Sequence, residues 1–303
     1  MSGNILHTWE TEAKDGIAFA ELVERHPELG GRRLALIGYS NTSENVFRGS
    51  MCAFHVDGDL ETPVWTRQIA DDQMPSGLVD EGYSSAEFGV RWADATDVFP
   101  DRDHLGSELI VVYQHSVYSP RSVCIYDLSG TLLYQIWHDG SLNSGYWMPT
   151  VRLLVFPGLN SEVRWPQRGE PDLDHAHPIV VFAVQPKLGH IVNTWTTTSP
   201  GGDPRTLAWY KCFLPAASAD LFGALELRGR LPGDEAGPFI RFGAPLVRNP
   251  RASVNWLIDQ TGAVVPESHV SSDKYKMLQE HGNAPDPDIF YLGELPPIVS
   301  VTE

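Results

Sequence analysis

The densest group of metal-ligand side chains lies at residues 172–177, DLDHAH. Successive side chains of an extended strand point to opposite faces, so His175 and His177 share one face and Asp174 lies on the other. To hold zinc, two imidazoles need at least a third ligand and neighbouring residues that orient the ligands through hydrogen bonds. No third ligand is obvious nearby in the sequence. We therefore interpret this group as a solvated loop.

A second pairing, His138 and Asp139, follows Trp137 in the run WHDG. A histidine beside a carboxylate can do acid–base work, but a turn in which the histidine caps backbone groups is the simpler interpretation. The chain has no Gly-x-Ser-x-Gly elbow, phosphate-loop lysine, dinucleotide fingerprint or His-Glu-x-x-His helix. Because these motifs are absent, the sequence gives no evidence for the enzyme classes that they mark.

The elements that must position any site are short strands. Residues 108–137 read as three of them, ELIVVY, SVCIYD and LLYQIW, with a polar loop before the second strand and an LSGT turn before the third. An isolated three-stranded sheet cannot cover both of its faces, so the sequence must supply further sheets to pack on it.

Similar strand orders recur along the chain. Candidate strands precede two of the copies at residues 87–93 and 146–151, which gives four strands per copy. Residues 15–28 have spacings that fit a helix or a strand, and we expect the first strand of the first copy there. The other expected strands lie at residues 34–38, 51–56 and 63–65 of the first copy, 153–158, 178–184 and 190–195 of the third, and 207–215, 221–228, 239–247 and 253–265 of a divergent fourth region.

Repeats of about 40–50 residues with four strands each are typical of a β-propeller. We expect an all-β propeller of four-stranded antiparallel blades over residues 1–268. The expected number of blades is five, and any number from four to six fits the repeats. A β-sandwich is the alternative fold. ILHTWET at residues 5–11 resembles IVNTWTT at residues 191–197, so an orphan N-terminal strand is expected to close the ring. One helix at residues 272–281 and a tail are expected within residues 269–303, packed on or completing the last blade.

Composition limits the partners. The net charge of −17 argues against binding to a phosphate backbone, and no run of about 18 apolar residues predicts a membrane span. The N-terminus lacks the basic and apolar regions of a signal peptide, which favours a cytoplasmic protein; a chain that is a fragment could be extracellular. Three dispersed cysteines, Cys52, Cys124 and Cys212, predict free thiols rather than a disulfide framework.

The residues around 97–137 resemble FG-GAP/VCBS propeller repeats, in which an acidic, glycine-containing loop precedes a strand, as in ATDVFPDRDHLGSELIVV here. The resemblance covers roughly residues 33–195 and fades afterwards. The run CIYDLSGTLLYQIWHDG is also similar to a run found in bacterial extracellular or kinase-linked proteins that carry such repeats. The resemblance implies a scaffold and recognition role, and a Ca²⁺ site with oxygen ligands from the acidic loop. Its four ligands would be Asp97, Asp101, Asp103 and Glu108. The first-copy loop, RHPELGGRR, departs from this pattern because arginines replace the acids.

We therefore expect a non-catalytic propeller that binds a protein or glycan partner, with no cofactor other than Ca²⁺. The alternative is a glycoside-active enzyme, because five-bladed propellers can hold paired carboxylates in a central cleft. Glu21, Asp94 and Asp97, on or just after expected first strands, would be its acids. Convergence of two of these carboxylates at one place would distinguish a site from scattered surface charge.

Overall fold

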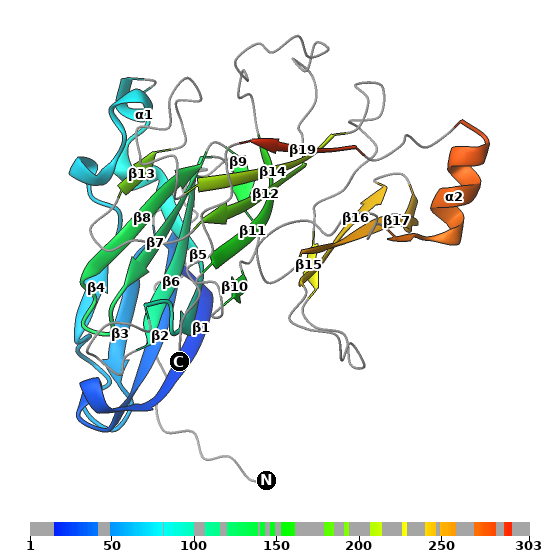
Figure 1. Ribbon diagram of the computed structural model, residues 1–303. Coiled ribbons are helices and arrows are strands. Elements are labelled where there is room, and N and C mark those ends of the chain that lie inside the picture. The colour runs from blue at the N-terminus through cyan, green and yellow to red at the C-terminus, as the bar shows by residue number, and fades with distance from the viewer. Residues whose placement is uncertain are drawn as a thin grey trace. The chain divides into compact units, whose positions relative to one another are not determined.

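The structure is a computed structural model of the 303-residue chain (Figure 1). The chain forms two compact units, Met1–Trp137 and His138–Glu303. The residues that the structure describes are 15–41, 49–80, 82–99, 107–115, 120–138, 140–142, 146–148, 153–160, 179–184, 191–193, 207–213, 226–228, 240–246, 249–258, 270–282 and 288–292.

Two antiparallel sheets build the first unit, and in each the four strands that this unit supplies follow one another in chain order. The first sheet contains β1 (Asp15–His26), β2 (Arg32–Asn41), β3 (Met51–His55) and β4 (Trp65–Arg67). The second contains β5 (Phe88–Thr96), β6 (Glu108–His115), β7 (Arg121–Tyr126) and β8 (Leu132–His138). The connection between the sheets includes the short helix α1 (Ser76–Asp80).

The turn between β7 and β8 shows how local sequence sets these meanders. Gly130 has a φ of 81°, a conformation that glycine adopts without strain. Its N–H donates to the Asp127 carbonyl, and the Asp127 carboxylate accepts from the Thr131 N–H at 2.8 Å. Asp and Gly are therefore suited to the two ends of this turn, and the predicted LSGT turn is confirmed.

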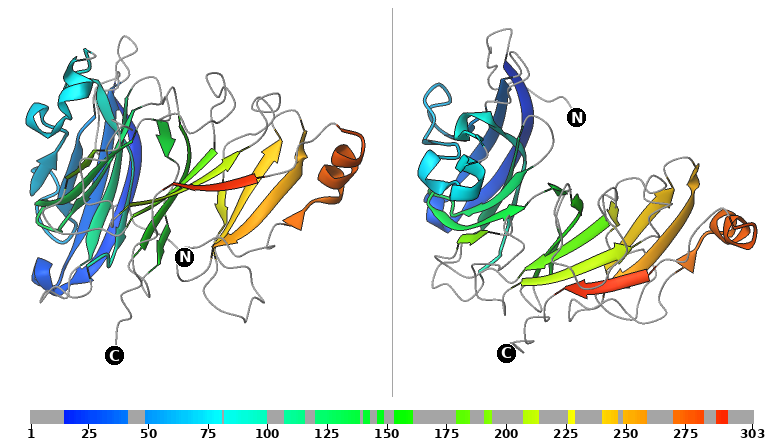
Figure 2. Two further views of the ribbon diagram at one scale, coloured as in Figure 1. Left: turned by 45° about the horizontal axis from the view of Figure 1, so that its top comes forward. Right: turned by 90° about the horizontal axis from the view of Figure 1, so that it is seen from above.

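The same turn docks on the first sheet. The Trp65 indole of β4 donates from Nε1 to the Leu128 carbonyl at 3.0 Å, and the Arg67 guanidinium donates to the Gly130 carbonyl. A Cβ at Gly130 would lie 2.8 Å from the Trp65 ring, so the close approach also requires glycine. At the other side of the unit, β5 lies against β1 and β2 (Figure 2).

Apolar side chains fill the space between the two sheets. The register places Leu34, Leu36 and Met51 on the same face of the first sheet as Trp65, the residue that contacts the second sheet. Within the second sheet, Phe88 of β5 meets Trp137 of β8 edge to face at a centroid distance of 5.3 Å. Burial of these side chains supplies the main driving force for this packing.

The second sheet is covered more completely than the first. Every residue of β6 and β7 is buried, so both faces of these strands are shielded from water. In the first sheet, Leu22 of β1 is 47% exposed, whereas Val23 is buried. The apolar runs of β6 and β7 are typical of strands with two covered faces.

Strands also dominate the second unit. One sheet has the order β10-β11-β12-β14-β19, with β9 also paired to β11, and another has the order β15-β16-β17-β18. Helix α2 (Asp273–Glu280) lies against β17. The strands are β9 (Gly140–Leu142), β10 (Tyr146–Met148), β11 (Leu153–Asn160), β12 (Ile179–Val184), β13 (Ile191–Asn193), β14 (Leu207–Phe213), β15 (Glu226–Arg228), β16 (Ile240–Leu246), β17 (Asn249–Ile258), β18 (Val270–Ser271) and β19 (Asp288–Leu292).

The chain is all-β with few helices, as the sequence predicts. β1 confirms a strand rather than a helix at residues 15–28, and α2 confirms the predicted helix, with the Ser272 hydroxyl accepting from the Tyr275 N–H. One prediction is wrong: β14, not the strand within residues 190–195, pairs with β12, along its whole length from Ile179 to Val184. β13 is only three residues long and offers a shorter ladder. The expected N-terminal strand at residues 5–11 lies outside the described residues.

Gly49 tests the contact between the two sheets. A Cβ there would lie 2.3 Å from the Tyr39 carbonyl oxygen and 3.0 Å from the Val90 nitrogen of β5, so backbone must move. We expect Gly49→Ala to lower the free energy of unfolding by about 1–3 kcal/mol, measured by urea denaturation. Gly58→Ala is the control, because its nearest atom would lie 3.6 Å away. Equal stability of the two variants would contradict this packing.

Candidate functional site

Two carboxylates that sequence analysis singles out, Glu21 and Asp94, come together in the first unit. Glu21 lies in β1 opposite Leu36, and Asp94 lies in β5 opposite Ile110. Each strand is the first of its sheet and stands at its edge, and the two strands lie against each other. Adjacency of these edges therefore brings together acids that are far apart in sequence.

The two groups interact electrostatically. Burial raises the pKa of Glu21, and the negative charge of Asp94 raises it further. Burial also raises the pKa of Asp94, although a hydrogen bond from the Ala95 backbone acts in the opposite direction. Glu21 is half-buried and Asp94 is exposed. Among the described residues, neither carboxylate forms an ion pair, so within this part of the chain the two acids concentrate negative charge.

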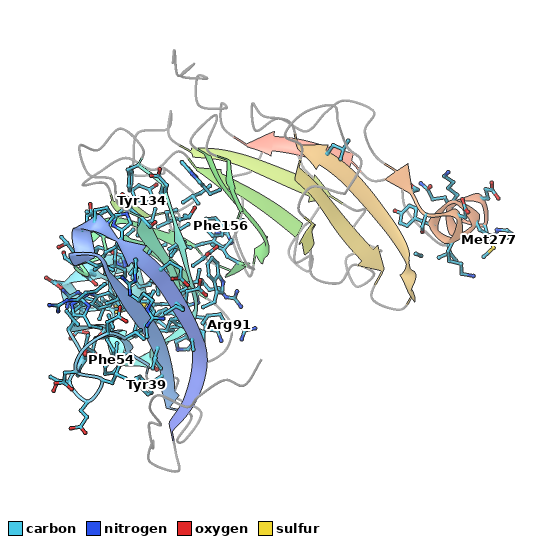
Figure 3. The ribbon with its side chains drawn as sticks, turned by 90° about the horizontal axis from the view of Figure 1, so that it is seen from below. Tyr39, Phe54, Arg91, Tyr134, Phe156 and Met277 are labelled. Atoms are coloured by element: carbon cyan, nitrogen blue, oxygen red, sulfur yellow. The ribbon has the colours of Figure 1, made fainter. Side chains whose placement is uncertain are left out.

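Backbone irregularities lie close to both acids. The β5–β6 ladder shifts register between Val90 and Trp92, so Arg91 is the extra residue of a bulge. Its side chain is exposed and extends outward from the first unit (Figure 3). The β1–β2 ladder shifts between Ile17 and Phe19. Bulges re-aim side chains and are common beside functional sites, which is consistent with a site at these two edges.

The four expected calcium ligands are only partly described. Asp97 follows β5 and is exposed, whereas Glu108 begins β6 and is buried. One carboxylate oxygen of Glu108 accepts from the backbone N–H of Val98 at 3.0 Å and of Phe99 at 3.5 Å. Glu108 therefore fixes the start of this loop through hydrogen bonds. Asp101 and Asp103 lie outside the described residues, and those residues contain no cluster of three or more metal-ligand side chains.

The structure does not place the other histidine, aspartate and cysteine residues considered from the sequence at this site. His138 is the last residue of β8 and is buried, as expected for a strand end. Asp139, with the turn expected there, and the group at residues 172–177 lie outside the described residues. Cys124 is buried and its pKa is raised to about 12 by burial, while Cys52 is half-buried; both thiols are free. These two cysteines confirm the prediction of free thiols.

Sequence reasoning missed a second polar group at the start of β5. The Glu87 carboxylate accepts from the Ser84 N–H at 2.7 Å and lies 3.8 Å from His115 Nε2. Burial favours a higher pKa for Glu87, but the hydrogen bonds from Ser84 and the nearby His115 lower it overall. The Tyr83 ring meets the His115 ring edge to face at 4.9 Å. The Ser-x-x-Glu spacing was the available signal, since it predicts a capping box.

Comparisons with protein-family models, curated proteins and solved structures found no match. The resemblance to FG-GAP/VCBS repeats therefore stays a prediction. Within the part of the chain that the structure describes, none of the helices has the length and apolarity to cross a membrane.

The pair makes a specific prediction about pH. Because the folded-state pKa of each acid lies above its ordinary value, the folded protein holds these protons more tightly, and stability falls as pH rises above the ordinary carboxyl range. Glu21→Gln and Asp94→Asn are each expected to raise the free energy of unfolding at about pH 7.5 by a few tenths of a kcal/mol, given screening by water. The gain should shrink at about pH 4.

Urea denaturation at both pH values measures this effect. Glu61→Gln, in an exposed turn, is the matched control and should show no gain at either pH. A loss of stability in both site variants at about pH 7.5 would show that the two carboxylates do not repel each other.

Proposed function

We propose that this chain is a non-catalytic recognition module whose ligand site is the Glu21–Asp94 pair and whose partner is a protein or a glycan. The observation that supports the proposal most directly is the convergence of two carboxylates with raised pKa values at adjacent strand edges. Such a pair reduces stability at neutral pH. Polar groups that weaken a fold are common where they serve binding.

We further propose that the two sheets of the first unit are neighbouring blades of a β-propeller of about five blades, closed by the strand near residues 5–11. Each sheet is a meander in chain order, as a blade is. Their first strands lie side by side, and β4 contacts the β7–β8 turn, which is the arrangement expected of adjacent blades. In this architecture Glu21 and Asp94 would face the central opening.

A glycoside-active enzyme is the second candidate, because the same two carboxylates satisfy its first requirement. A glycosidase needs one acid that is protonated and a second carboxylate that is ionised, so their pKa values must be pushed apart. Here burial raises both pKa values, but the charge of Asp94 raises that of Glu21 further, whereas a backbone hydrogen bond from Ala95 lowers that of Asp94. These directions are compatible with both candidates, and the assays below decide between binding and hydrolysis.

Paired binding assays test the proposed function. The wild-type chain, a Glu21→Gln/Asp94→Asn double variant and a Glu61→Gln/Asp80→Asn control are applied to an oligosaccharide array and a peptide array. Wild type and control should retain a common ligand that the double variant loses, because only the double variant removes the site carboxylates. Retention of the same ligands by all three proteins would contradict the proposal.

The same oligosaccharides, incubated with wild-type protein in solution, separate binding from catalysis. Reducing ends should not accumulate. Their release by wild type, together with its loss in the Glu21→Gln or Asp94→Asn variant, would establish the enzyme instead.

The calcium hypothesis has its own test. A Ca²⁺ ion held by the loop that Asp97 and Glu108 flank would stabilise the folded state, so the melting temperature should rise on addition of Ca²⁺ and fall on addition of chelator. Asp97→Asn should abolish that response. A melting temperature that is unchanged by either addition would remove the metal from this account.

A further inference from the structure

Beside Asp94, the second sheet presents an aromatic ring and an amide. Asp94 and Trp92 are paired with Ile110 and Val112 of β6, so both side chains project from one face of the sheet. Gln114 lies two residues beyond Val112 and projects from the same face. Trp92, Asp94 and Gln114 therefore share one face at the edge where Glu21 approaches.

Two polar atoms of this group are shielded from water without a protein partner. They are the Nε1 of Trp92 and the Oε1 of Gln114, and neither forms a hydrogen bond. Gln114 as a whole is only 3% exposed. An unpaired buried donor or acceptor costs about 1–3 kcal/mol. Because neither atom contacts solvent, a ligand reaches them only when neighbouring side chains move aside, and a ligand that then satisfies both atoms recovers part of this cost.

The two atoms need different partners. The indole N–H is a donor only, whereas the amide oxygen is an acceptor only. A hydroxyl group can accept from the first and donate to the second, and hydroxyls also donate to carboxylates such as Glu21 and Asp94. The indole ring adds an apolar surface on which the C–H face of a sugar ring can stack.

From this combination we propose that the site binds an uncharged carbohydrate, with its ring on Trp92 and its hydroxyls on Glu21, Asp94 and Gln114. The inference rests on the proposed function and specifies its ligand class. A cationic peptide is the rival, because two carboxylates attract positive charge. The indole N–H and the exposed guanidinium of Arg91, next to Trp92 in the bulge, both disfavour a cation.

The test uses the full chain and calorimetric titration with neutral hexasaccharides of glucose, xylose, mannose and N-acetylglucosamine, each to about 10 mM. At least one should bind. Trp92→Ala and Asp94→Asn should each weaken that binding about tenfold, and Trp92→Phe, which keeps a ring but loses the N–H, should weaken it less. Asp80→Asn, on an exposed helix end, should bind like wild type.

Trp92→Phe and Asp94→Asn remain informative if Trp92→Ala does not fold. Sugar binding that none of the site variants changes would overturn the inference, and so would the absence of binding by every hexasaccharide. In that second case an octalysine peptide is titrated. Binding of the peptide by wild type and its loss in Asp94→Asn would retain the recognition site and reject the carbohydrate, whereas no binding of either probe would reject the carbohydrate and the Glu21–Asp94 site together.

Discussion

Burial of two apolar sheet faces against each other is the constraint on which the first unit depends. Neither meander can cover its own faces, so Leu34, Leu36 and Met51 remain out of water only while the second sheet is in place. Trp65 fixes the relation between the sheets by joining packing to a directed hydrogen bond on the Leu128 carbonyl. Glycine at position 130 permits that approach. The positions of β1 and β5, and so of the candidate site, follow from this packing.

At the opposite edge the same packing brings together groups that oppose it. Glu21 and Asp94 are half-buried and exposed, respectively, and the charge of Asp94 makes ionisation of Glu21 less favourable. Nearby, the indole of Trp92 and the amide of Gln114 hold shielded polar atoms without partners. A well-packed core with like charges and unpaired polar atoms at one edge is the arrangement expected when an external ligand completes the hydrogen bonding.

Local signals predicted most of the first unit. The alternating or apolar runs of β2, β3, β6 and β7, and the Asp–Gly turn at residues 127–131, determine their own structure over a few residues. Local signals could not predict that β12 pairs with β14, because strand pairing depends on ladder length and on chain segments far apart in sequence. Glu21 and Asp94 were identified as isolated candidates on first strands, but only the adjacency of β1 and β5 pairs them. Trp92 and Gln114 gave no signal, since their significance lies in missing partners.

The central claim is that Glu21 and Asp94 form an electrostatically coupled pair at a binding site. Carboxyl carbon chemical shifts of Glu21, followed by NMR across a pH titration of wild type and Asp94→Asn, test it most directly. We expect a Glu21 pKa above the ordinary glutamate value in wild type and a lower one in the variant. A Glu21 pKa at its ordinary value that is the same in both proteins would contradict the pair and the site built on it.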